Sequence, residues 1–459
     1  MYDSLIPLSV SIVVCTYNEE VLLPFCLNSL LNLDYPKDKL EIIVVDNNST
    51  DRTAEIIKKY PVKYLFEPKP GLARARNRGI QEAKGELVAF TDADCVVSNG
   101  WLKHLVLNFD RPEIVGVGGK ILPAPGAKGY ALDPELMLQE KVMRGNLPKY
   151  SPYIIGANCA YRKNIIQEIG IFDEGFLLAA GEDVDLGWRL YWRGYKFKYA
   201  PEAIVYHFHR STLLTLYKQF FCYGYADLHR YRKHIEKFGC RIVNEMTSIT
   251  LKEWKNLYSL LTKTILNLIF CPGENRFFIL SKFIRHIAMT TGKMVANFQN
   301  KKYTIAYFPD WSKGNPYQVL LYRHLLKEGF YALPESRFGI NWLLKSFLFV
   351  KFIHFHWLDG VCNLKKKGIL AFGKLIFFSS QLVVAKLLGY KIIWTVHNYL
   401  PHEMQHPNLE KRVTKIVAKT ADRIIVHCNY AKEWVKKEYE IKGRKVFSVP
   451  HGNYVNYYL

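Results

Sequence analysis

The sequence predicts an α/β protein with two mainly parallel sheets and a helical segment between them. In the first half of the 459-residue chain, short β-rich apolar runs alternate with helical patterns, which is typical of a parallel sheet. The same alternation restarts near Lys302, after a long amphipathic helical stretch. A chain of this length is also too long for one core, so we expect two or three domains.

The first half contains four apolar runs that we expect to form strands. They are Val10–Cys15, Glu41–Asp46, Val62–Phe66 and Leu87–Thr91, with helices expected over Leu22–Leu30, Ala54–Tyr60 and Leu72–Ala83. Two of these strands lead into carboxylates, one at Asp46 and the other at Asp92 and Asp94. Ligands of open α/β sheets bind at the carboxyl ends of the strands, so these carboxylates can line one crevice.

The Asp92-Ala93-Asp94 sequence has two interpretations when it is considered alone. Two hard oxygen ligands at the end of a strand suit Mg²⁺ or Mn²⁺, with water and phosphate completing the coordination. A polar turn in which Asp94 or Ser98 caps the helix that begins near Trp101 explains the same residues. The spacing by itself leaves both interpretations open.

The composition indicates an anionic partner and a reducing compartment. The net charge of +22 suits nucleic acid, an anionic membrane surface or phosphorylated ligands, but the basic residues are spread along the chain and no nucleic-acid-binding motif is present. The nine cysteines are odd in number and lack a Cys-x-x-Cys pair, which argues against a disulfide framework. Met1–Pro7 does not resemble a signal peptide, and no stretch reaches about 18 uncharged apolar residues. We therefore expect a cytoplasmic protein without a spanning helix.

A series of short motifs follows one order along residues 8–235. The motifs are Thr16–Glu19, Val45–Asp51, Gly71–Asn77, Asp92–Asp94, Gly156–Arg162, Gly170–Glu174, Gly181–Arg189 and Val205–Arg210. In residue type and order they resemble the family 2 glycosyltransferases of the GT-A fold, which have a Rossmann-like, mainly parallel sheet. The resemblance implies an inverting enzyme that moves a sugar from a nucleotide-diphosphate sugar to a hydroxyl of a glycan or lipid-linked acceptor.

The resemblance implies donor-side roles for the strand-end carboxylates and for the turn after the first strand. The residues implied to hold the nucleotide sugar are Thr16, Tyr17, Glu19, Asp46 and Asp92. Asp94 is implied to contact Mg²⁺ or Mn²⁺, with Asp92 and His207 in the metal shell. His209 points to the same face of a strand as His207 and is the alternative ligand. The metal would neutralise the departing diphosphate.

Two arginines are further candidates for the nucleotide-sugar site. Arg74 and Arg78 lie four residues apart on one helical face, where they can meet phosphate charge. A solvated basic face explains Arg78 equally well. Both are included in the predicted nucleotide-sugar site.

Asp183, with Glu182 beside it, is the predicted general base. The two residues open a helix, whose backbone N–H groups and dipole favour an ionised carboxylate. Simple N-capping is the alternative outside the context of the resemblance. Asn158, Trp188 and Arg189 are candidates for acceptor contacts. Because the Gln-x-x-Arg-Trp motif of the processive family members is missing, we expect a single-addition enzyme.

The helical stretch after the first half mixes aromatic, apolar and basic residues. We place a family 2 domain at residues 1–235, an amphipathic connector at 236–300 and a second domain at 301–459. Basic, apolar helices suit the surface of an anionic bilayer, which would place the enzyme on the cytoplasmic face of the membrane. A helical platform packed between two domains, with a solvated basic side, explains the connector equally well.

The segment from about residue 303 to 458 resembles the N-terminal, acceptor-binding half of GT-B glycosyltransferases. His397-Asn398 and His451-Gly452-Asn453 are the most specific parts of that resemblance and follow predicted strands. The nucleotide-binding half of such an enzyme is missing, so we expect either a truncated or split product, with a partner supplying the other half, or a half-domain that serves as an acceptor or docking module. Rival hypotheses for the whole chain are a non-catalytic sugar-nucleotide-binding scaffold and a basic nucleic-acid-binding protein. We expect no nucleic-acid partner.

Overall fold

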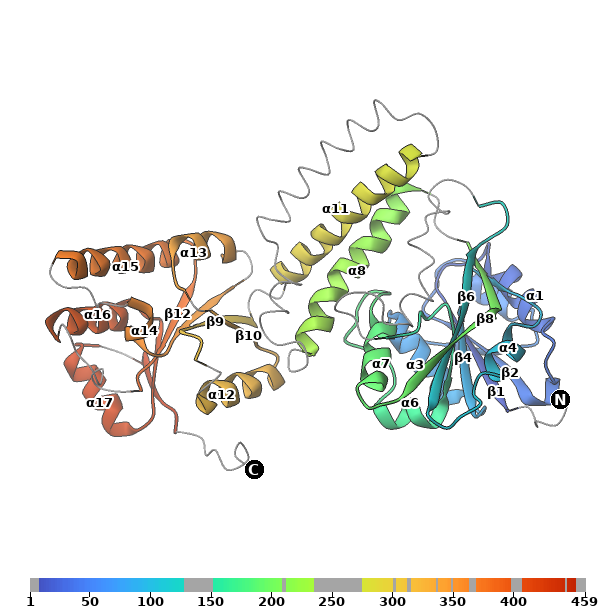
Figure 1. The fold of residues 1–459 in the computed structure, drawn as a ribbon, viewed down its shortest axis with the longest axis horizontal. Coiled ribbons are helices and arrows are strands. Elements are labelled where there is room, and N and C mark those ends of the chain that lie inside the picture. Colours follow the sequence, from blue (N-terminus) through green and yellow to red (C-terminus); the bar gives the residue numbers. More distant parts are fainter. Residues whose placement is uncertain are drawn as a thin grey trace. The chain divides into compact units, whose positions relative to one another are not determined.

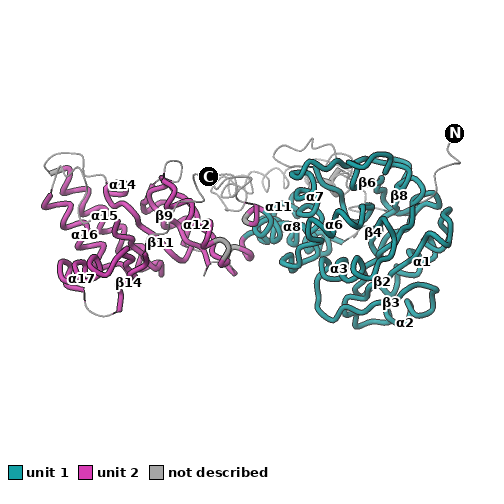
Figure 2. Tube along the Cα trace, turned by 90° about the horizontal axis from the view of Figure 1, so that it is seen from below, with its two compact units in different colours: residues 1–230, 251–293 teal, residues 231–250, 294–459 magenta. Residues whose placement is uncertain are grey.

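The computed structural model describes residues 8–127, 152–208, 212–234, 275–299, 303–311, 315–335, 337–347, 350–362, 369–397, 407–441 and 444–450 (Figure 1). The chain divides into two compact units (Figure 2). Unit 1 comprises residues 1–230 and 251–293, and unit 2 comprises residues 231–250 and 294–459. The three-domain division remains a prediction, because much of residues 236–300 lies outside the described ranges.

Unit 1 is built on an eight-stranded sheet in the order β3-β2-β1-β4-β7-β6-β8-β5. The strands are β1 (Val10–Thr16), β2 (Leu40–Asp46), β3 (Lys63–Phe66), β4 (Leu87–Asp92), β5 (Cys95–Val97), β6 (Ile114–Pro123), β7 (Asn158–Arg162) and β8 (Lys196–His207). The first four strands are parallel, β7 runs antiparallel to β4 and β6, and β5 runs antiparallel to β8. The four predicted strands and the predicted mainly parallel sheet are confirmed.

Both faces of this sheet are covered, so alternate residues of β1 enter different cores. The helices are α1 (Leu23–Leu31), α2 (Thr53–Ile57), α3 (Leu72–Glu82), α4 (Trp101–Val106), α6 (Lys163–Ile169) and α7 (Glu182–Tyr191), with a short 3-10 turn at Lys37–Lys39. Ile12 and Val14 pack with α1 and α4, whereas Val13 packs with α3 and α7. Burial on both faces explains why the strands read as continuous apolar runs.

Two long helices follow the sheet, α8 (Leu213–Lys233) and α11 (Asn275–Gln299), and they lie side by side (Figure 1). Their backbones approach closely at two glycines. A Cβ atom on Gly224 would lie 2.1 Å from the Met289 carbonyl oxygen, and one on Gly292 would lie 2.2 Å from the Phe221 carbonyl oxygen. Helical structure is therefore confirmed at both ends of the predicted helical region.

Unit 2 is built on a six-stranded sheet in the order β10-β9-β11-β12-β13-β14, and every pairing is parallel. The strands are β9 (Thr304–Phe308), β10 (Tyr331–Pro334), β11 (Phe352–Phe355), β12 (Lys391–Thr395), β13 (Arg423–Val426) and β14 (Val446–Ser448). The helices are α12 (Pro316–Lys327), α13 (Ile340–Ser346), α14 (Leu358–Cys362), α15 (Ile369–Leu387), α16 (Pro407–Thr420) and α17 (Asn429–Glu438). The predicted second Rossmann-like sheet is confirmed.

One helix among the described residues, α15, is long and apolar enough to cross a membrane. Its window Leu370–Leu387 has a mean hydropathy of 1.5, and 33% of that window is buried inside unit 2. The window includes Lys374 and Lys386, which the sequence prediction counted against a span. A single helix of this kind is weak evidence for a span, because the core helix of a water-soluble domain has the same length and composition.

Candidate active site

The carboxyl ends of neighbouring strands bring the predicted donor-side carboxylates to one edge of unit 1. In the parallel register, Thr16 of β1 lies beside Asp46 of β2, and Cys15 lies beside Asp92 of β4. Asp46 and Asp92 therefore flank the end of β1, at the edge where open α/β sheets bind ligands.

The turns that follow β1 and β2 are joined by hydrogen bonds between side chains and backbone. Asn18, with a φ of 53°, accepts from the Thr50 N–H through Oδ1 at 2.7 Å and donates its own N–H to Ser49 Oγ at 3.0 Å. Asp46 Oδ1 accepts from the Ser49 N–H at 2.9 Å. The two turns therefore form one rigid rim beside the strand ends.

The residues predicted to hold the nucleotide differ in how they face this rim. Thr16 and Asp46 are buried, and Asp46 Oδ2 accepts from the Tyr64 hydroxyl at 3.3 Å. The Glu19 N–H is anchored by the side chain at the start of α2. Tyr17 is 57% exposed and presents an aromatic face on which a base or ribose can pack.

Asp94 and His207 come together because β5 pairs with the end of β8. Cys95 lies opposite His207 in that antiparallel register, and His207 Nε2 is 3.3 Å from Asp94 Oδ1. Two adjacent ligands of an octahedral ion at about 2.1 Å from it lie about 3 Å apart. The pair therefore has the spacing of two ligands of one ion.

The third donor at this position is Cys95. Within the described ranges, Asp94, Cys95 and His207 form the one group of three His, Cys, Asp or Glu donors close enough to hold a metal ion. Burial raises the pKa of the Cys95 thiol well above its ordinary value, and the charges of Asp94 and Asp92 raise it further. A protonated thiol is a poor ligand for Mg²⁺ or Mn²⁺, so Asp94 and His207 are the residues that fit. The alternative ligand His209 lies outside the described residues.

A buried arginine links two of the predicted site carboxylates. Arg76 is 3% exposed, and its Nη1 donates to Glu182 Oε1 at 2.6 Å while its Nη2 donates to Asp92 Oδ1 at 3.4 Å. Burial raises the pKa of Glu182 to about 7, and the guanidinium opposes that shift. Burial likewise raises the pKa of Asp92, again against the effect of Arg76. Arg76 is therefore the counter-charge for the buried Glu182 and the half-buried Asp92 at this edge.

Sequence reasoning selected the two neighbouring arginines and missed Arg76. The structure pairs Arg74 Nε with Glu174 Oε2 at 3.7 Å and Arg78 Nη2 with Glu82 Oε1 at 3.5 Å, both at partly exposed positions. Helical spacing was the available signal, because Arg76 shares the buried face of α3 with residues three before and four after it.

Asp183 and Glu182 point in different directions at the start of α7. Gly181 precedes them in the left-handed region, with a φ of 88°. Glu182 is buried against the arginine, whereas Asp183 is half-buried. Asp183 Oδ2 accepts from the Gly156 N–H at 3.1 Å, and Oδ1 accepts from the Val184 N–H at 2.8 Å. Of the pair, Asp183 is therefore the carboxylate that a substrate can reach.

The three acceptor candidates lie largely inside the fold, and their contact with an acceptor stays a prediction. The Asn158 side chain accepts from Trp101 Nε1 at 2.8 Å and donates to the carbonyl oxygens of Lys120 and Ala203 at 2.9 Å. Trp188 is fully buried. Arg189 donates to Asp185 Oδ2 at 2.8 Å and to carbonyl oxygens of the segment that follows α6. These polar groups are held inside the fold because they join separate elements.

Helix α8 supplies a residue near the catalytic carboxylates that sequence reasoning did not select. The Tyr223 hydroxyl accepts from Gln219 Nε2 at 2.9 Å. Burial raises the pKa of Tyr223 to about 12, and the negative charges of Asp183, Asp92 and Glu182 contribute to the increase. Tyr223 is 38% exposed, so α8 presents a phenol at the surface of unit 1.

The carboxyl edge of the unit 2 sheet has a different composition, dominated by histidines. The Tyr322 hydroxyl lies 2.8 Å from His354 Nδ1 and 2.6 Å from His356 Nε2. His354 Nε2 lies 2.7 Å from Thr395 Oγ1, and His356 Nδ1 lies 3.1 Å from His397 Nε2. The predicted loop residue His397 therefore belongs to a buried hydrogen-bonded chain.

Aromatic rings extend this histidine cluster. Trp357 stacks on His397 with ring centroids 4.2 Å apart, and Trp311 stacks on Trp357 at 4.9 Å. The other predicted residues of this edge, Asn398 and His451–Asn453, lie outside the described residues.

Comparison with known proteins gives two family matches within the chain. The sequence model of glycosyl transferase family 2 matches residues 11–170, and that of glycosyltransferase family 4 matches residues 373–453. The probable glycosyltransferase YdaM of Bacillus subtilis is 33% identical over 225 residues, which are 46% of this chain and 53% of that protein. The chain therefore spans about half the length of that relative.

Two further matches are to another named glycosyltransferase and to a solved structure. The glycosyltransferase AglE of Haloferax volcanii is 30% identical over 222 residues, which are 46% of this chain and 70% of that protein. Among solved structures, the mannosyltransferase PcManGT of Pyrobaculum calidifontis, in complex with GDP-Man and Mn²⁺, is 20% identical with a TM-score of 0.48, covering 63% of this chain and 88% of that one. Both relatives are named glycosyltransferases, in agreement with the class that the site motifs of unit 1 predict. Through unit 1, the chain belongs to glycosyl transferase family 2.

Proposed function

We propose that unit 1 transfers a sugar, with inversion and with the help of Mg²⁺ or Mn²⁺, from a nucleotide-diphosphate sugar to a hydroxyl of a glycan or lipid-linked acceptor. The observation that carries this proposal is the arrangement of three groups in unit 1: the Asp94–His207 pair, the Asp92–Arg76–Glu182 bridge and the half-buried Asp183. A cation site and a free base are what such a displacement requires.

Asp94 and His207 would hold the metal, with Asp92 as a further oxygen donor nearby. When bound, the ion neutralises negative charge on the diphosphate as it departs. The oxygen and imidazole donors suit Mn²⁺ and Mg²⁺, and their 3.3 Å separation matches adjacent ligand positions. Arg76 keeps Asp92 in place because it is itself buried and cannot swing toward solvent.

Asp183 acts as the general base. Two backbone N–H groups hold its oxygens, and its place in the first turn of α7 stabilises the negative charge. It takes the proton of the acceptor hydroxyl while that oxygen bonds to the anomeric carbon and the bond from that carbon to the diphosphate oxygen breaks. One displacement of this kind inverts the anomeric configuration.

We assign acceptor contacts to α8 within unit 1 and, separately, acceptor docking to unit 2. Tyr223 lies near the general base, and the histidine and aromatic edge of unit 2 offers neutral hydrogen-bonding groups and ring faces of the kind that suit sugars. In this proposal unit 2 docks the acceptor. The enzyme works in the cytoplasm, peripherally on the inner face of the membrane, where its charge of +22 favours anionic lipids.

The test is nucleotide release from a panel of UDP-, GDP- and dTDP-sugars, with and without Mn²⁺. Asp183→Asn is expected to lower acceptor-dependent release by about 10²- to 10⁴-fold, because a positioned base contributes that much. Asp94→Ala is expected to abolish the response to Mn²⁺. Asp110→Asn, an exposed carboxylate paired with Lys198, is the matched control and should retain the native rate. Release that survives in both site variants would overturn the assignment, and donor binding without turnover would identify a scaffold.

A further inference from the structure

The outer face of α15 in unit 2 has no charge on it. The exposed residues recur every three or four positions, as expected for one face of a helix. They are Leu370, Phe372, Gly373, Ile376, Phe377, Ser380, Val383 and Leu387. The large apolar members are between 45% and 82% exposed. An ordinary surface helix carries charged or polar residues on this face, so the apolar row requires a separate explanation.

The opposite face of α15 is already used by the core of unit 2. Leu375, Phe378, Leu382 and Ala385 are buried against the sheet and its neighbouring helices. Lys386 is held by Asp422 at 2.7 Å. A helix whose outer face is apolar and whose inner face is anchored in a core can lie on a membrane without leaving its domain, whereas crossing the membrane would remove its inner face from the core.

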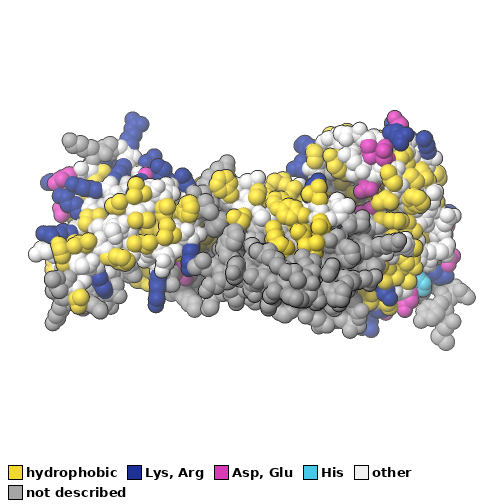
Figure 3. All heavy atoms as spheres, turned by 90° about the horizontal axis from the view of Figure 1, so that it is seen from above, with side chains coloured by type: hydrophobic (Ala, Val, Ile, Leu, Met, Phe, Trp, Pro, Cys, Tyr) yellow, Lys and Arg dark blue, Asp and Glu magenta, His cyan; other side chains and the backbone are white. Residues whose placement is uncertain are grey.

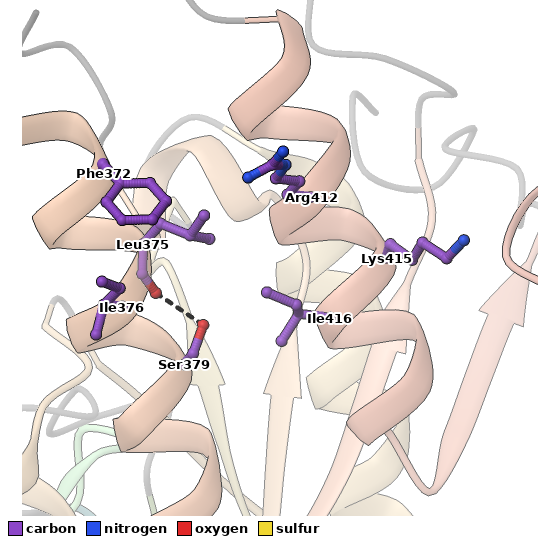
Figure 4. Close-up of a pocket in the computed structure, with 7 residues that line it drawn as sticks. All are labelled: Phe372, Leu375, Ile376, Ser379, Arg412, Lys415 and Ile416. Atoms are coloured by element: carbon purple, nitrogen blue, oxygen red, sulfur yellow. Dashed lines mark hydrogen bonds between the residues drawn. The ribbon is translucent and has the colours of Figure 1, made fainter. Parts of the chain in front are cut away.

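A groove between α15 and α16 adds positive charge to this apolar face. The groove has a volume of about 400 Å³ and is lined by Phe372, Leu375, Ile376, Ser379, Arg412, Lys415 and Ile416. Figure 4 shows the Arg412 side chain over the groove and Lys415 directed away from it. Lys415 pairs with Glu440 at 3.3 Å, whereas Arg412 makes no ion pair with any residue that the structure describes. The groove therefore combines an apolar floor with one cation at its rim, Arg412, that has no ion pair among the described residues.

The surface around α15 also combines apolar side chains with nearby positive charge. Figure 3 shows hydrophobic side chains gathered on the side of unit 2 that carries α13 and α15, with Lys and Arg around them. The row from Leu370 to Leu387 is about 26 Å long at 1.5 Å per residue. An apolar strip bordered by cations is complementary to an anionic bilayer, in which acyl chains lie beneath a layer of phosphates.

We propose that α15 and α16 form a membrane-contact surface of unit 2, in which the apolar face of α15 enters the acyl boundary of an anionic bilayer and Arg412 meets a lipid phosphate. This inference rests on the proposed peripheral location of the enzyme and names the surface responsible. It is independent of the donor chemistry, because unit 2 binds the membrane whether or not unit 1 turns over.

The test is cosedimentation of the full chain with vesicles of phosphatidylcholine containing phosphatidylglycerol, compared with pure phosphatidylcholine. The double variant Ile376→Gln/Phe377→Gln keeps good helix formers and is expected to weaken binding by about tenfold or more, since two apolar side chains no longer leave water. Arg412→Gln is expected to weaken binding about fivefold on the anionic vesicles alone.

Matched control variants test whether vesicle binding depends on this surface in particular. Leu107→Gln and Lys437→Gln change an exposed apolar residue of unit 1 and a cation of α17, and both should bind as the native chain does. Asp183→Asn should also bind as the native chain does, which distinguishes loss of docking from loss of transfer. Native binding by the α15 double variant would overturn the proposal. Light scattering provides a second check. If the native chain is a dimer that the double variant dissociates, and vesicle binding does not change, a second copy of the chain covers this face and the proposal is overturned.

Discussion

Units 1 and 2 are both built on mainly parallel sheets, yet the polar groups at the carboxyl ends of their strands differ in charge. The edge of unit 1 holds charge: Arg76 lies between Glu182 and Asp92, and Asp94 faces His207. The edge of unit 2 holds neutral groups, since burial lowers the pKa of His354 to about 3. Its histidines satisfy one another through Tyr322 and Thr395.

This difference shows what decides whether a strand end can carry charge. In unit 1 a buried guanidinium compensates the carboxylates that burial would otherwise neutralise. In unit 2 burial acts on His356 as well, lowering its pKa well below the ordinary value, and the neighbouring histidines lower it further. Cation-assisted chemistry therefore fits the first edge, and neutral hydrogen bonding fits the second.

The largest effect on stability is expected from removing the positive charge of Arg76 in unit 1. Arg76→Met leaves the buried Glu182 and the half-buried Asp92 without this partner and is expected to cost about 3–5 kcal/mol in the free energy of unfolding. Denaturant unfolding of the full chain, followed by hydrogen exchange in β1 and β4, measures this cost. Arg76→Met/Glu182→Gln should recover part of the loss, because one of the unpaired charges is gone. Unchanged stability of the single variant would contradict the ion-bridge interpretation.

An intermediate effect on the stability of unit 2 is expected from lowering the pH. A histidine that is neutral when folded takes up a proton on unfolding below its ordinary pKa of about 6.5. The unfolded state then binds more protons, so stability is complete above about pH 6.5 and falls as the pH decreases toward 3, by about 1.4 kcal/mol per pH unit for each such histidine.

The variant His354→Gln isolates the contribution of one histidine to this pH dependence. It cannot titrate in this range, so the slope of stability against pH should fall by about one proton. Hydrogen exchange in β11 and β12 at a series of pH values reports unit 2 separately from unit 1. An unchanged slope would show that His354 is protonated in the folded protein.

The smallest effect is expected from Arg78, two residues from Arg76 on the same helix. Its pair with Glu82 is partly exposed, so Arg78→Gln should change the free energy of unfolding by less than about 0.5 kcal/mol. The same denaturation experiment provides the comparison with Arg76→Met. If donor affinity in the nucleotide-release assay falls strongly while stability is unchanged, Arg78 contacts phosphate as the sequence suggested.

The sequence by itself determined much of the fold and the order of the site motifs. The strands ending at Asp46 and Asp92 were predictable because apolar runs between polar turns are local signals. Asp94, His207 and Asp183 were selected by residue type and motif order, and the structure brings Asp94 and His207 within 3.3 Å of each other. The family of unit 1 could therefore be predicted from the chain alone.

Only the tertiary structure decided which polar side chains face inward. Arg76 is buried while Arg74 and Arg78 remain at the surface, because successive residues of a helix turn by about 100° and the sheet covers one face. The Asn158 side chain is hydrogen-bonded to a tryptophan and to two carbonyl groups from other elements. Such contacts join residues far apart in the chain, so no local pattern contains them, and burial then sets which groups keep their charge.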